Sequence, residues 1–200
     1  MFFNYSKYMG IYVIVLINLV ITSNFSLAER YINTSAKYVY LMDYDTGRVL
    51  LEKASNIPTA PASMSKLMTI YMAFEALKQE RISLDTELVV SENAWRKKDE
   101  KGISLPASGS TMFLEPLTKV SFEDLLRGII VQSGNDACIV ISEALSGSEE
   151  GFANDMNQKA KLLNLNNSNF TNSTGWPHKD HKMSSRDLAI CAAAGQFVHL

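Results

Sequence analysis

Cysteine, proline and glycine are all scarce in this 200-residue chain, which has two Cys, five Pro and ten Gly. Two cysteines cannot form the disulfide framework on which small secreted scaffolds depend. We interpret Cys138 and Cys191 as small buried residues on helices, with a bridge between them left open. Collagen-like and low-complexity classes are excluded, and a hydrophobic content of 46% excludes a disordered chain. Length and composition fit one domain, with or without a short appendage.

An excess of charge of one sign is also absent. The 19 Lys and Arg residues stand against 21 Asp and Glu, so the formal net charge is −2. A surface for nucleic acid or anionic lipid would need a basic excess, so we expect no nucleic-acid partner. Long hydrophobic runs are missing too, because the most apolar stretch covers only residues 11–21. A membrane-spanning helix needs about 20 such residues.

The short apolar stretch predicts a secretory signal peptide over residues 1–28. Lys7 precedes it, and the small residues Ser26 and Ala28 occupy the positions that a signal peptidase reads. Cleavage after Ala28 would leave residues 29–200 as an exported chain with no visible membrane anchor. An uncleaved anchor is the alternative interpretation.

The rest of the chain predicts a mixture of one hairpin and several helices. Alternating side chains on either side of the turn at 45–48 predict the hairpin. Apolar residues at a spacing of three and four predict the helices. The expected elements are a hairpin at 37–53, a short strand at 86–90, and helices at about 63–79, 122–130, 137–145, 151–163 and from 185 onward.

Ser63 and Lys66 are the first candidates for chemistry. Residues three apart on a helix lie on the same face, and this face continues through the apolar Leu67, Ile70, Phe74 and Leu77. We therefore expect the lysine on the buried side, where desolvation lowers its pKa and lets it act as a base for the serine hydroxyl. A bare S-x-x-K also fits a serine at a helix start beside a surface lysine. The pair alone therefore does not distinguish a catalytic site from an ordinary helix start.

A second polar group, Ser133-Gly134-Asn135, falls between two predicted helices. A serine and an amide at such a point could pass a proton and bind a substrate amide. The same residues also fit an ordinary helix end followed by a helix start. Together, the S-x-x-K and S-x-N patterns resemble two of the three motifs of penicillin-recognising serine enzymes.

Longer phrases make this resemblance specific. Residues 61–69 resemble the active-site stretch of low-molecular-mass penicillin-binding proteins, the serine-type D-alanyl-D-alanine carboxypeptidases. The similarity extends over nearly all of residues 37–194. Other matching phrases, in the order of the family, are 43–50, 109–114, 133–137, 173–177 and 185–189. The resemblance implies an α/β (α+β) fold of the β-lactamase and penicillin-binding transpeptidase type, with an N-terminal hairpin and a helical subdomain.

The resemblance also implies roles for individual residues. Ser63 would be the nucleophile that forms the acyl-enzyme, and Lys66 its general base. Ser133 would pass a proton to the leaving amine, and Asn135 would hold the substrate amide. The implied substrate is a peptidoglycan stem peptide ending in D-Ala-D-Ala, and β-lactams would acylate Ser63 as substrate mimics. We expect no metal and no cofactor, and a location in the periplasm or on the outer face of the cytoplasmic membrane.

The third family motif, K-T-G, does not occur in the sequence. In the family it lies on a strand after the last helix and binds the substrate carboxylate. We therefore expect residues 29–200 to form an incomplete catalytic domain, with the later sheet strands missing and little carboxypeptidase activity. The alternatives are a serine β-lactamase and an inactive, truncated penicillin-binding envelope protein. A β-lactamase is disfavoured because no Glu lies near the Leu-Asn pairs at 163–166.

One polar loop carries two histidines. His178 and His181 flank Asp180, a combination that is able to bind a metal ion. Such residues in a polar loop are usually solvated, and we interpret these in that way.

Overall fold

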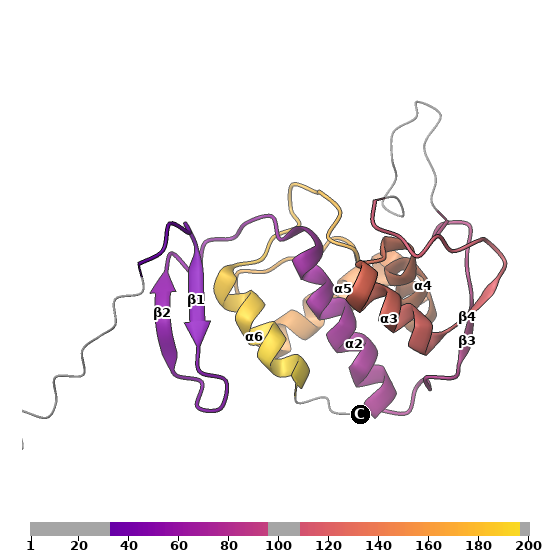
Figure 1. Cartoon of the computed structure of the whole chain (residues 1–200), viewed down its shortest axis with the longest axis horizontal. Helices are drawn as coiled ribbons and strands as arrows, with labels where there is room; N and C mark the ends of the chain where they lie inside the picture. Colours follow the sequence, from indigo (N-terminus) through magenta and orange to yellow (C-terminus); the bar gives the residue numbers. More distant parts are fainter. Residues whose placement is uncertain (1–32, 96–108, 197–200) are drawn as a thin grey trace, which may run out of the picture. The chain divides into compact units, whose positions relative to one another are not determined.

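The computed structural model describes residues 33–95 and 109–196, so the predicted signal peptide lies outside the described residues. All described helices and strands belong to one compact unit that begins at Ala36. Within these ranges, no helix combines the length and the apolar character needed to cross a membrane. In chain order the elements are β1 (Val39–Met42), β2 (Val49–Lys53), the 3-10 helix η2 (Ala62–Ser65), α2 (Lys66–Lys78), β3 (Glu87–Val89), β4 (Lys119–Ser121), α3 (Phe122–Gln132), α4 (Asn135–Ser146), α5 (Glu149–Leu162) and α6 (Ser185–Gln196) (Figure 1).

The predicted hairpin is confirmed, since β1 and β2 pair antiparallel with a register irregularity between Leu41 and Met42. Gly47 takes a positive φ of 70° in the turn, where glycine carries no steric penalty. The Asp43 carboxylate accepts a hydrogen bond from the Thr46 backbone N–H at 2.9 Å and so closes the turn. Strand β1 packs against α6, which covers one side of the hairpin (Figure 1).

The predicted helices are also confirmed, together with one of their caps. The Ser121 side chain accepts a hydrogen bond from the Asp124 N–H at 3.1 Å at the start of α3. Strand β4 was not expected, because its three residues carry only one large apolar side chain, Val120. It pairs antiparallel with β3, placing Leu88 opposite Val120.

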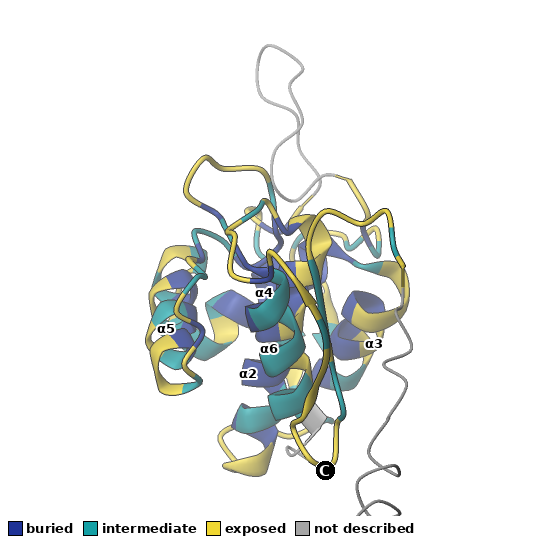
Figure 2. Cartoon of the chain, turned by 90° about the vertical axis from the view of Figure 1, so that its left-hand side faces the viewer, coloured by how far each residue is buried: buried dark blue, intermediate teal, exposed yellow. Residues whose placement is uncertain are grey.

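Helix α2 lies between two hydrophobic clusters, and this position determines which of its residues are buried. One cluster joins α2 to α3 and α4, and the other joins it to α5, α6 and the chain that precedes α6. Figure 2 colours the visible part of α2, behind α6, as buried. The expected buried stripe is therefore partly wrong: Leu67 is 37% exposed, and Ile70 and Phe74 are only half-buried. The buried residues of α2 are Lys66, Met68, Thr69, Tyr71, Met72, Ala73, Ala76 and Leu77.

The two cysteines are buried and unbridged, in agreement with their interpretation from the sequence. Cys138 lies on α4 in the first hydrophobic cluster, and Cys191 lies on α6 in the second. Burial is the main cause that raises the pKa of each thiol to about 12. Both therefore stay as protonated, packed side chains at neutral pH.

Candidate active site

Ser63 lies in the 3-10 helix η2, directly before α2, and its side chain is exposed. It lines a pocket of about 500 Å³. The preceding residue, Ala62, has a positive φ of 49°, a conformation that is costly for any residue with a Cβ. The buried Ser65 hydroxyl donates a hydrogen bond to the Ala62 carbonyl at 3.1 Å and holds this turn in place. Strained backbone of this kind is concentrated at functional sites.

Lys66 is the first residue of α2, and only 3% of it is exposed. Its amine lies 3.0 Å from Ser63 Oγ, 2.8 Å from Asn135 Oδ1 and 2.7 Å from the Thr174 carbonyl oxygen. The structure thus brings together three of the four site residues expected from the sequence. No carboxylate of a described residue pairs with this buried amine.

Burial lowers the pKa of Lys66 and outweighs an opposing effect of the nearby Cys138. A neutral amine has two N–H groups and one lone pair. The Asn135 amide oxygen and the Thr174 carbonyl can only accept hydrogen bonds, so they take the two N–H groups. Among the three partners only the Ser63 hydroxyl is able to donate, so the lone pair of a neutral amine would face it. In that protonation state Lys66 would be placed to take the Ser63 proton.

Asn135 is the first residue of α4, and the oxygen of its buried side chain accepts a hydrogen bond from the Lys66 amine. Its backbone N–H donates to the Ser110 carbonyl at 2.7 Å, which joins α4 to the loop at 109–114. The buried Asp136 carboxylate supports the same loop by accepting hydrogen bonds from the N–H groups of Met112 and Leu114 at 2.9 and 3.1 Å. Asn135 and Asp136 thus fix one wall of the pocket.

Ser133 ends α3 in a left-handed conformation, with a φ of 58°. Its hydroxyl makes no hydrogen bond to Ser63, Lys66 or Asn135 in the part of the chain that the structure describes. Of the four expected residues it is the one that the structure does not bring into direct contact with the others.

Thr174 was not expected as a site residue, because it contributes a backbone carbonyl rather than its side chain. The loop around it passes very close to η2, and Gly175 permits this approach at a φ of 81°. A Cβ at Gly175 would lie 2.0 Å from the Ala62 carbonyl oxygen. The sequence signal for this contact is the glycine after Thr174.

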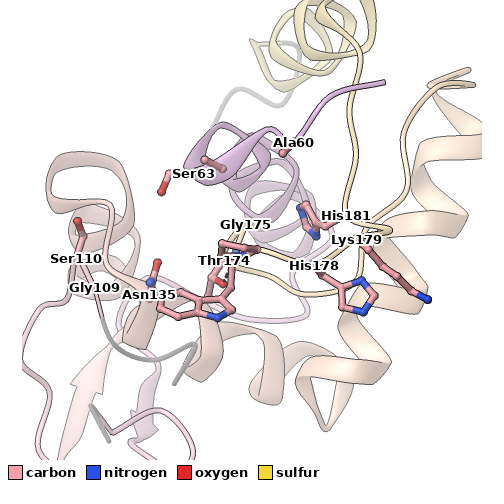
Figure 3. A pocket seen from close by; sticks show the side chains of 13 residues that line it. Ala60, Ser63, Gly109, Ser110, Asn135, Thr174, Gly175, His178, Lys179 and His181 are labelled. Carbon is pink, nitrogen blue, oxygen red and sulfur yellow. Dashed lines mark hydrogen bonds between the residues drawn. The ribbon is translucent and has the colours of Figure 1, made fainter. Parts of the chain in front are cut away.

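The pocket extends from Ser63 and Asn135 past Trp176 to His178, Lys179 and His181 (Figure 3). His178 is exposed, as expected, but His181 is only 2% exposed, so the expectation of two solvated histidines is wrong for it. Its Nδ1 accepts a hydrogen bond from the Thr171 N–H at 3.1 Å, and burial lowers its pKa to about 4. Among the described residues, no group of three His, Cys, Asp or Glu side chains is placed to hold a metal ion.

The sequence of the chain is similar to a known family of peptidases. The Peptidase S11 family, described as D-alanyl-D-alanine carboxypeptidase, matches residues 25–196. The D-alanyl-D-alanine carboxypeptidase DacF of Bacillus subtilis (strain 168) is 41% identical over 157 residues, which are 78% of this chain and 38% of the relative.

The structure is also similar to solved structures of such proteins. The D-alanyl-D-alanine carboxypeptidase DacD from Francisella tularensis superposes with a TM-score of 0.75 at 35% identity, over 82% of this chain and 37% of that one. Penicillin binding protein 5 from Haemophilus influenzae superposes with a TM-score of 0.74 at 36% identity, over 80% and 45% of the two chains. The expected fold type is therefore confirmed. The chain spans less than half the length of each of these three proteins.

Proposed function

Because the chain belongs to the D-alanyl-D-alanine carboxypeptidase family of peptidases, we propose that it carries the nucleophile and the general base of a serine-type D-Ala-D-Ala carboxypeptidase. The observation that supports this most directly is the set of three partners around the Lys66 amine, two of which only accept hydrogen bonds. A serine hydroxyl is a weak nucleophile until a neighbouring base removes its proton. Lys66 is buried, close and correctly oriented for that step.

In the proposed acylation, Ser63 Oγ attacks the carbonyl carbon of the penultimate D-Ala while its proton moves to Lys66 Nζ. A C–O bond forms, the C–N bond to the terminal D-Ala breaks, and the departing amine takes up a proton. Water then hydrolyses the ester, releasing the shortened peptide and restoring the Ser63 hydroxyl. General base catalysis of this kind contributes about 10²–10⁴-fold to the rate.

The other two residues have supporting roles in this proposal. Asn135 lines the pocket, and its amide oxygen accepts a hydrogen bond from Lys66. In this proposal its side chain also contacts the substrate amide, which is the role that the resemblance implies. Ser133 lies two residues away on the turn before α4 and would pass a proton to the leaving amine after a rotation of its hydroxyl.

The substrate class that we propose is a peptidoglycan stem peptide ending in D-Ala-D-Ala, with β-lactams as mimics that acylate Ser63. The names of the relatives support both parts, because they include a D-alanyl-D-alanine carboxypeptidase and a penicillin binding protein. Such a substrate lies outside the cytoplasm, which agrees with the signal peptide expected at residues 1–28 and with export of the chain.

The test is covalent labelling by a fluorescent penicillin, with the adduct located by mass spectrometry. We expect one adduct on Ser63, loss of labelling in Ser63→Ala, and retained labelling in Ser83→Ala. Ser83 is the control because it is an exposed serine that does not line the pocket and whose hydroxyl pairs with that of Thr86. An adduct on Ser65 or Ser133, or an unmodified chain that takes no label, would contradict the proposal.

A further inference from the structure

The carbonyl of Thr174 is held in place by contacts that lie outside the pocket. Ser173, the residue before it, is fully buried, and its backbone N–H and its hydroxyl donate to the same oxygen, Glu149 Oε1, at 3.0 and 2.8 Å. Glu149 is in the first turn of α5, where the helix dipole favours a carboxylate. The start of α5 is thereby connected to the residue that precedes the Lys66 partner.

A second contact fixes the same residue from the side of α2. The buried Thr69 hydroxyl donates to the Ser173 carbonyl at 2.7 Å. Thr69 follows Lys66 by three residues and so lies on the same face of α2. Ser173 is thus held at its N–H and hydroxyl by α5 and at its carbonyl by α2, which leaves its peptide plane little freedom.

The loop is also braced from within by Asn172. Its Oδ1 accepts hydrogen bonds from the N–H groups of Gly175 and Trp176 at 2.8 and 3.0 Å, and longer ones from the N–H and the hydroxyl of Thr174 at 3.2 and 3.1 Å. Its Nδ2 donates to the Trp176 carbonyl at 3.0 Å. An Asn side chain that takes the place of a backbone turn in this way fixes the conformation of the following residues.

We propose that Glu149 and Asn172 are positioning residues, which hold the Thr174 carbonyl oxygen against the amine of Lys66. Their side chains bond to the loop at 172–176 rather than to the Lys66 amine or the Ser63 hydroxyl, so both act through that loop. Two consequences follow. The carbonyl keeps one N–H of the amine occupied, which leaves the lone pair facing Ser63, and the loop covers the amine against water.

This inference rests on the proposed function for its catalytic meaning, but its structural part is measurable without a substrate. The titration of Lys66 is observable by NMR on a chain with ¹³C-labelled lysine, its signal being the one missing in Lys66→Arg. Burial is the main cause that lowers the pKa of Lys66. Water admitted by a loosened loop should therefore move that midpoint upward.

Glu149→Ala and Glu149→Gln form a matched pair. Both bonds from Ser173 go to one oxygen, so a glutamine keeps that acceptor and loses only the charge. We expect Glu149→Ala to move the Lys66 midpoint upward and to slow labelling by penicillin about tenfold to a hundredfold, as a displaced catalytic group does. Glu149→Gln should return the midpoint to that of the unmodified chain and the labelling rate to within about twofold of it.

Two further variants keep the test decisive if Glu149→Ala does not fold. Asn172→Ala removes the internal brace, and Thr69→Val removes one hydrogen bond with almost no change in shape. Each should shift the Lys66 midpoint in the same direction as Glu149→Ala. Folded variants with an unchanged midpoint and an unchanged labelling rate would overturn the positioning role.

The two proposals fail in different ways. If the unmodified chain takes no label while the variants still move the Lys66 midpoint, the proposed function is wrong and the positioning role stands. If the chain labels at Ser63 while the loop variants change neither quantity, the function stands and the positioning role is wrong.

Discussion

Gly175 passes so close to Ala62 that a single added carbon would lie 2.0 Å from the Ala62 carbonyl oxygen. Ala62 is the residue before Ser63, the proposed nucleophile, and Gly175 follows Thr174, whose carbonyl accepts a hydrogen bond from Lys66, the proposed base. The two halves of the site are therefore in direct backbone contact, and the contact depends on the absence of a side chain at position 175.

Replacement of this glycine should damage both stability and reactivity. In Gly175→Ala, the new carbon must push the loop away from η2, in addition to the cost of a left-handed alanine, which is about 1 kcal/mol. Gly147→Ala is the matched control, since Gly147 has a φ of 78° and open space where a Cβ would lie. Urea unfolding and penicillin labelling should show a small loss of stability for Gly147→Ala, and a larger loss with slower labelling for Gly175→Ala. Equal effects would contradict the close contact.

The pH dependence of acylation should follow the titration of the Lys66 amine. The base works only when its amine is neutral, so labelling should accelerate as the pH rises through the lowered pKa of Lys66 and then level off. Lys66→Ala should reduce the rate by about 10²–10⁴-fold and abolish this dependence. The labelling rate should be measured between pH 5 and about 9.5. This range lies below the ordinary pKa of lysine, where a lysine with a lowered pKa titrates. A variant that keeps the wild-type profile would show that another group is the base.

His181 should make the chain sensitive to acid. Its pKa is lowered to about 4 by burial, whereas a histidine in the unfolded chain titrates near 6.5. Stability is therefore fully present above pH ~6.5 and is lost as the pH falls toward about 4, by up to ~3 kcal/mol. His181→Asn keeps an acceptor for the Thr171 N–H and should flatten this part of the profile. The exposed His178→Asn is the control, and an unchanged slope in His181→Asn would refute the assignment.

The buried carboxylate of Asp136 should not be replaceable by its own amide. Both of its oxygens accept backbone N–H groups, Oδ1 from Met112 and Oδ2 from Leu114. In Asp136→Asn, an N–H₂ group replaces one of these oxygens and faces a backbone N–H group. Two donors then oppose each other, at a cost of about 1–3 kcal/mol in the free energy of unfolding. Asp155→Asn is the control, because its partner, the Ser146 hydroxyl, is able to rotate and accept instead. Denaturant unfolding compares the two, and equal stabilities would contradict this role of Asp136.

Leu117 offers a stabilising change. It has a φ of 65° and is 80% exposed, so it carries backbone strain without contributing buried surface. Leu117→Gly should relieve the strain and raise the free energy of unfolding by roughly 0.5–1 kcal/mol. The same replacement at Leu162, which is 73% exposed at the end of α5, should instead lower stability. Thermal melts of the two variants should move in opposite directions.

Sequence patterns predicted the helices and the hairpin because each carries a clear apolar period and its own turn or cap residues. They failed where the surroundings of an element decide its burial. Leu67 was expected inside, but η2 places a tighter 3-10 turn before α2, and α2 is packed on more than one side. An amphipathic pattern assumes one buried face, which α2 does not have.

For the site, the sequence predicted three side chains that the structure brings together, because Ser63, Lys66 and Asn135 stand in short motifs. It did not identify what holds them. The Thr174 contribution is a backbone carbonyl, which every residue type possesses. Glu149 belongs to none of the motifs, and it is 24 residues from Ser173, the loop residue that it binds. Such partners follow from the fold and leave no local pattern.

The contact between Lys66 and Thr174 spans 108 residues of chain. Before that span has closed, Lys66 is a hydrated cation, and Ser63 is an alcohol no more reactive than any other serine. On the proposed function, a chain in which this contact has not formed should lack an activated serine, and it should gain one when the segment around Thr174 packs onto α2. The appearance of penicillin labelling during refolding should therefore report the formation of this contact.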